Sequence, residues 1–117
     1  MKIQINTDAN IQSSQALTDM VQDAIDHALS RFAEHITRIE VHLSDENAGK
    51  SGQHEQRCMM EARLESRQPV AVTEQAPIMA QAVQGAAQKL AHLLSSALGR
   101  LHDHKEKTSG LPLSGTE

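Results

Sequence analysis

The chain has almost no aromatic residues, with one Phe and no Trp or Tyr among 117 residues. Binding of single strands by stacking bases on aromatic rings is therefore disfavoured, and the core must be filled by aliphatic side chains. The only cysteine, Cys58, excludes an internal disulfide and a cysteine zinc cluster. The residues around Cys58 alternate so that its thiol is expected to point into the core as a small apolar group.

Long apolar runs are absent as well. No stretch approaches the ~20 apolar residues of a membrane-spanning helix, and the first residues do not form a signal peptide. We therefore expect a cytoplasmic protein with no membrane partner. The net charge of -4 argues against a general attraction to DNA or RNA, although it does not decide the charge of a local patch.

The segment 57–72 is predicted to form the hairpin at the centre of the fold. From Arg57 to Glu65 apolar and charged side chains alternate in steps of two, which is typical of a half-buried strand. A polar break and Pro69 separate it from the β-branched run 70–73. Two short strands around a polar break indicate an antiparallel hairpin with one apolar and one charged face.

Apolar residues at helical spacing predict a helix on each side of this hairpin. Ser13 or Ser14 is a suitable N-cap for the first, and Phe32 lies at the end of its apolar stripe. Pro77 suits the first turn of the second helix. A further alternating segment precedes the hairpin, with Thr37, Ile39, Val41 and Leu43 on its apolar side.

These patterns predict the order β-α-β-β-β-α. Each strand has one apolar face, so both helices must cover the same face of the sheet and leave the other open to water. A crossover helix joins the first two strands, which should therefore be parallel, whereas the later strands form an antiparallel meander. The predicted fold class is α+β, a two-layer sandwich of a four-stranded mixed sheet with two helices on one face. The predicted strands are 2–7, 37–44, 56–65 and 69–74, and the predicted helices are 14–35 and 77–104.

This order, with these lengths, resembles the ribosome hibernation-promoting factor and ribosome-associated inhibitor family. The resemblance covers about residues 1–105, which we assign to one domain, followed by a flexible tail at 106–117. The matching segments are MKIQINTDAN at 1–10, the second strand at 36–44, the third at 58–64, and the last helix at 81–101 with its pair Lys89-Leu90.

The resemblance implies a non-enzymatic factor that binds the small ribosomal subunit near the decoding centre and silences translation during stress or stationary phase. It implies 16S rRNA as the partner, with no cofactor and no small-molecule substrate. Long members add a dimerisation domain, whereas this chain resembles the short type, for which we expect a monomer or at most a weak dimer. Family contacts come largely from basic side chains on the two helices, which here are Arg31, Lys89, Arg100 and Lys105.

The charges of the first predicted helix favour a second hypothesis. Its acidic residues, which outnumber its single cation Arg31, are Asp19, Asp23, Asp26 and Glu34. The alternative is a protein-binding or self-associating module of the same fold that has lost rRNA binding. A continuous strip of the four helical cations would favour rRNA binding, and cations neutralised by nearby acids would favour the alternative.

Metal and catalytic sites are disfavoured. His102 and His104 are two residues apart and would lie on different faces of a helix, whereas zinc ligands on a helix are typically three or four apart. No serine has a matching His and acid pattern. The charged residues of the open face are explained as cross-strand ion pairs between Arg38, Arg57 or Arg63 and Glu40, Glu61 or Glu65.

Overall fold

The computed structural model describes residues 1–46 and 55–108, and the side chains of the last helix as far as Leu98. The elements follow the predicted order, with a short 3-10 helix added after the first helix. They are β1 (Lys2–Thr7), α1 (Gln15–Leu29), η1 (Ser30–His35), β2 (Ile36–Asp45), β3 (Gln56–Leu64), β4 (Val70–Ala76) and α2 (Met79–Thr108).

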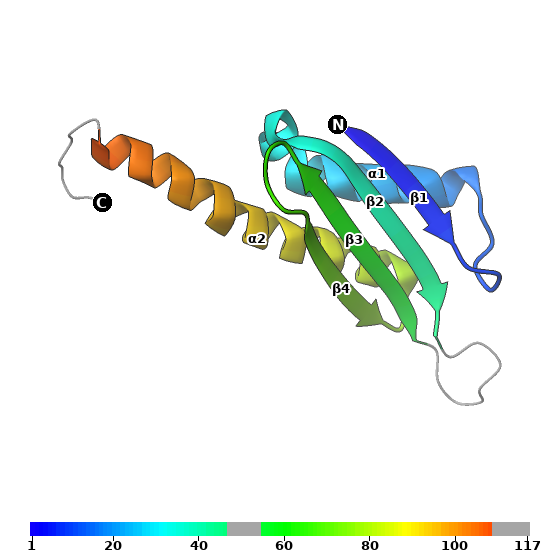
Figure 1. Cartoon of the computed structure of the whole chain (residues 1–117). Coiled ribbons are helices and arrows are strands. Elements are labelled where there is room, and N and C mark those ends of the chain that lie inside the picture. The colour runs from blue at the N-terminus through cyan, green and yellow to red at the C-terminus, as the bar shows by residue number, and fades with distance from the viewer. Residues whose placement is uncertain (47–54, 109–117) are drawn as a thin grey trace.

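The four strands form one sheet in the order β1-β2-β3-β4. β1 is parallel to β2, and the β2–β3 and β3–β4 pairs are antiparallel. Both helices lie on the same side of the sheet, with α2 packed on β3 and β4 and with α1 beside α2 (Figure 1). The α+β prediction, the parallel first pair and the open second face are therefore confirmed.

The first helix changes from α to 3-10 before its predicted end. Ser14 is its N-cap, and the Ser14 hydroxyl accepts a hydrogen bond from the backbone N–H of Leu17 at 3.1 Å. The α-helix ends at Leu29, whose φ of -120° leaves the helical range, and residues 30–35 continue as the tighter 3-10 helix. The predicted helix over 14–35 is therefore helical to His35, but its last six residues are 3-10 rather than α, a distinction that apolar spacing does not make.

The start of β2 also differs from the prediction. The pairing with β3 shifts between Ile36 and Arg38, so Ile36 is buried and Thr37 is exposed. The Thr37 hydroxyl instead donates to the backbone oxygen of Arg63 at 2.9 Å. The assignment of Thr37 to the apolar face was wrong, because an irregularity in pairing moves every preceding side chain to the other face.

The second helix begins and ends later than predicted. Pro77 precedes it, and the backbone oxygen of Ile78 accepts from the N–H groups of Gln81 and Ala82. Placing Pro77 in the first helical turn was therefore wrong. The helix reaches Thr108, so 106–108 of the predicted tail are helical, and 109–117 lie outside the described residues.

The core lies between the sheet and the helices and is aliphatic, as predicted. α1 contributes Val21, Ile25 and Leu29, and α2 contributes Leu90 and Leu94, all fully buried. The strands contribute alternate residues, of which the fully buried ones include Ile39, Val41, Met60 and Ala62. Because the strands place most of their apolar residues on the helix side, the charged residues of β2 and β3 are left together on the open face.

Phe32, the only aromatic residue, is expected to be a large contributor to stability. It is only 8% exposed and belongs to the core cluster, which it joins from η1. Phe32→Ala should lower the free energy of unfolding by about 3–5 kcal/mol, since truncation leaves a cavity in addition to losing apolar burial. Urea unfolding followed by circular dichroism measures this. A loss below about 1 kcal/mol would show that Phe32 is not a core residue.

Cys58 should make stability depend on pH in the alkaline range. It is fully buried, and desolvation raises the pKa of its thiol from 9.0 to about 12. Between these values the folded state holds more protons than the unfolded state, so this contribution is complete below pH 9 and is lost as pH rises towards 12. In urea unfolding, the stability advantage of the wild type over Cys58→Ala should shrink across this range. A constant difference would contradict the prediction.

Candidate functional site

The outer side of the helical layer is acidic to neutral in the part of the chain that the structure describes. Asp19, Asp23 and Asp26 of α1 are exposed. A groove of about 760 Å³ lies between α1 and α2, and its polar lining consists of Asp19, Asp23, His27, Gln84 and Gln88. No Lys or Arg lines this groove, so its charge would repel phosphate rather than attract it.

Two of the four predicted rRNA contacts can be placed with their side chains. Arg31 lies exposed on η1, with its guanidinium carbon 4.7 Å from the centre of the Phe32 ring. Lys89 lies on α2, and its Nζ is 2.6 Å from Glu74 Oε1 and donates to the backbone oxygen of Thr73 at 2.9 Å. The charge of Lys89 is therefore already matched by an acid.

Arg100 and Lys105 belong to α2, but their side chains lie outside the described residues. Arg31 and Lys89 come from different elements, and each makes its own local contact. The continuous basic strip formed by the four helical cations therefore stays a prediction.

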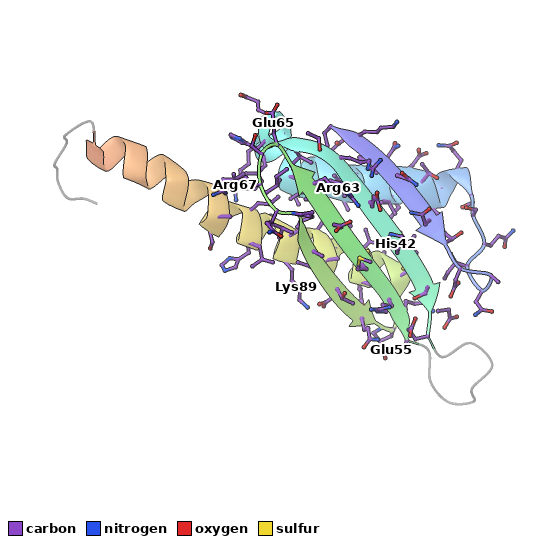
Figure 2. The ribbon with its side chains drawn as sticks, viewed as in Figure 1. His42, Glu55, Arg63, Glu65, Arg67 and Lys89 are labelled. Carbon is purple, nitrogen blue, oxygen red and sulfur yellow. The ribbon has the colours of Figure 1, made fainter. Side chains whose placement is uncertain are left out.

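The close approach of α2 to β4 at Gly85 brings Lys89 beside Glu74. A Cβ at Gly85 would lie 2.8 Å from Glu74 Cγ, so a larger residue there would force the Glu74 side chain to shift. Lys89 follows Gly85 by four residues and therefore lies on the same side of α2. Figure 2 shows Lys89 beside β4, at the edge of the sheet.

The open face of the sheet carries charged side chains arranged in rows by the strand register. Lys2 of β1 is opposite Arg38 of β2, which is opposite Arg63 of β3. In the next row Glu40 is opposite Glu61. Like charges therefore face one another directly across the strands, an arrangement that is normally destabilising.

Ion pairs along and diagonally between the strands offset this repulsion. Glu40 Oε2 lies 2.6 Å from Arg38 Nη2 and 3.6 Å from Arg63 Nε. Arg63 Nη2 is also 3.4 Å from Glu61 Oε1, and His42 Nε2 is 3.8 Å from Glu40 Oε1. Of these contacts between Arg and Glu, only Arg63–Glu40 joins two strands, so the predicted cross-strand pairing holds for that pair alone.

The remaining charged residues of the predicted ion-pair set behave differently. Glu65 follows the end of β3 and is exposed in the turn, away from the charged rows (Figure 2). Arg57 is partly buried and Lys2 is exposed, and neither makes an ion pair with the residues that the structure describes. Both cations lie on the open face, and no described carboxylate contacts them.

The sequence reasoning did not identify this cluster as a candidate site. Alternation placed Arg38, Arg57 and Arg63 on the outer face, but it did not show which of them lie opposite one another. Lys2 was placed in a first strand parallel to the second, but without a register that would set it opposite Arg38. The register of β1 with β2 and of β2 with β3 is the information that assembles the rows.

The described residues contain no group of three or more His, Cys, Asp or Glu side chains that could hold a metal ion. Within the same residues, no helix is long and apolar enough to cross a membrane.

The model of the family described as "Sigma 54 modulation protein / S30EA ribosomal protein" matches residues 3–108. The crystal structure of the Thermus thermophilus Protein Y N-terminal domain has a similar fold, with a TM-score of 0.67 and 23% sequence identity over 82% of this chain and 98% of that one. A ribosomal subunit interface protein from Coxiella burnetii is also similar, with a TM-score of 0.71 and 16% identity over 85% of this chain and 99% of that one. No curated protein sequence matches the chain.

Glu40 should contribute more to stability than Glu61, because its carboxylate contacts two guanidinium groups that would otherwise repel one another. Glu40 contacts both Arg38 and Arg63, whereas Glu61 contacts Arg63 at 3.4 Å. Glu40→Gln should destabilise the fold by about 1 kcal/mol, while Glu61→Gln should change stability by less than about half of that. Urea unfolding at low salt compares the two variants. Equal effects would show that the network is not centred on Glu40.

Proposed function

Because the chain belongs to the Sigma 54 modulation protein / S30EA ribosomal protein family, we propose that it binds the small ribosomal subunit in the cytoplasm and silences translation during stress or stationary phase, without catalysing a reaction. The observation that carries the proposal is the extent of the family match, which runs from β1 through α2. The similar fold of a protein described as a ribosomal subunit interface protein supports it.

The chemistry proposed for this binding is contact between cations and the phosphates of 16S rRNA. The proposed helical contacts remain Arg31, Lys89, Arg100 and Lys105. Lys89 can reach a phosphate only by leaving Glu74 and the Thr73 carbonyl, so we expect it to contribute less than an unpaired cation. The lack of aromatic residues is compatible with this mode, because phosphate contacts need no stacking surface.

One observation favours the alternative of a protein-binding or self-associating module. The helical side combines the exposed carboxylates of α1 with a groove that no cation lines. The pairing of Lys89 with Glu74 also meets the condition stated for this alternative. A factor that had lost rRNA binding would use such a surface for a basic partner or for a second copy of the chain.

Binding to purified small subunits distinguishes the two functions. We expect the protein to co-sediment with small subunits at about 50 mM salt and to be largely released by about 200 mM, because each neutralised phosphate releases counterions. It should also inhibit translation in a reconstituted reaction. Absence of binding at the lower salt concentration would refute the ribosome-associated function and favour the protein-binding alternative, for which size-exclusion chromatography reports self-association.

A further inference from the structure

The open face of the strands and the exposed face of α1 carry opposite charge. Within the strands, the Lys and Arg residues of the open face are Lys2, Arg38, Arg57 and Arg63, and the carboxylates are Glu40 and Glu61, a formal charge of four minus two, or plus two. Just beyond the strands, at the end of the face where Arg57 lies, the pairing continues through Glu46 and Glu55, and Glu46 Oε2 accepts from Ser44 Oγ at 2.7 Å. The excess of positive charge is therefore at the opposite end, around Lys2, Arg38 and Arg63. On the helical side, α1 alone presents three exposed Asp residues and no Lys or Arg. A polyanion approaching the described part of the molecule is therefore attracted to the end of the sheet that carries Lys2, Arg38 and Arg63, and it is repelled by α1.

The carboxylates of the open face lie deeper than the cations. The side chains of Arg38 and Arg63 are 37% and 46% exposed, whereas those of Glu40 and Glu61 are 17% and 28% exposed. These two arginines therefore expose more of their side chains to a partner than the acids they pair with, although Arg38 Nε itself is buried without a hydrogen-bond partner among the described residues.

The cations of the open face lie at two separate positions along the strands. The row of Lys2, Arg38 and Arg63 lies at one end, and Arg57 lies opposite Ser44, six residues further along β2 than Arg38. At about 3.3 Å per residue this separates the two groups by roughly 20 Å. The positions between them hold the polar residues Gln4, Asn6 and His42, together with Glu40, Glu61 and Met59. Figure 2 shows Arg63 and His42 on this uncovered face.

We propose that the open sheet face, through Lys2, Arg38, Arg57 and Arg63, binds the phosphate backbone of ribosomal RNA. This inference rests on the proposed function and moves part of the contact from the helices to the sheet. Glu40 already contacts Arg38 and Arg63, so among the described residues Lys2 and Arg57 are the cations of this face that a phosphate meets without competition from a paired carboxylate. Without aromatic side chains on the face, recognition depends on backbone phosphates rather than on stacked bases.

Two matched double variants test the proposal. Lys2→Gln with Arg57→Gln removes two positive charges from the sheet face without breaking an ion pair among the described residues. Arg31→Gln with Lys89→Gln removes two positive charges from the helical side, so both variants have the same net charge. Their affinities for purified small subunits are measured by co-sedimentation across a salt series, and circular dichroism and urea unfolding check each fold.

We expect the sheet variant to bind at least about tenfold more weakly than the wild type and to lower the salt dependence by roughly two phosphate contacts. The helical variant should lose less affinity. If the sheet double variant does not fold, Lys2→Gln alone is used, because Lys2 is exposed, and at least a severalfold loss is expected.

If the sheet variant binds small subunits with the same affinity and salt dependence as the wild type, the proposal is overturned, while the ribosome-associated function remains in place. A larger loss in the helical variant, with the sheet variant unchanged, would assign the contact to the helices. Failure of the wild type to bind small subunits at low salt would refute the proposed function and, with it, this inference.

Discussion

Burial of a single face of the sheet is the constraint on which the rest of this structure depends. The strands place most of their apolar residues on the helix side, and Ile39, Val41 and Met60 are completely buried there. With one aromatic residue available, the core is built from aliphatic side chains on both layers. Because the helices occupy that side, no element covers the other face in the described part of the chain (Figure 1).

The same constraint sorts the charges of the molecule. Alternation sends the cations of β2 and β3 to the open face, where the register places like charges opposite one another. Glu40 makes this arrangement tolerable by contacting Arg38 and Arg63 together. On β4 the alternation has a different result, because Glu74 points towards the helices, where Gly85 leaves space for it and Lys89 pairs with it.

These two environments change how a cation in the sequence should be interpreted. Lys89 lies on α2 and was predicted to contact rRNA, yet Glu74 and a backbone carbonyl already hold its ammonium group. Arg57 lies on a strand and is uncompensated among the described residues. Availability for a phosphate therefore depends on what lies beside the side chain in the fold, and not on the type of element that carries it.

The sequence by itself determined the order of elements, the fold class, the parallel first pair of strands and the buried position of Cys58. These follow from local periodicity, because a period of two or of 3.6 residues sets which side chains share a face. The tertiary structure alone decided the end of α1 at Leu29, the exposure of Thr37, the pairing of Lys89 with Glu74 and the row of Lys2, Arg38 and Arg63. Each of these depends on the register of a strand or on the distance between two elements, and neither quantity is encoded in the spacing of residues along one segment.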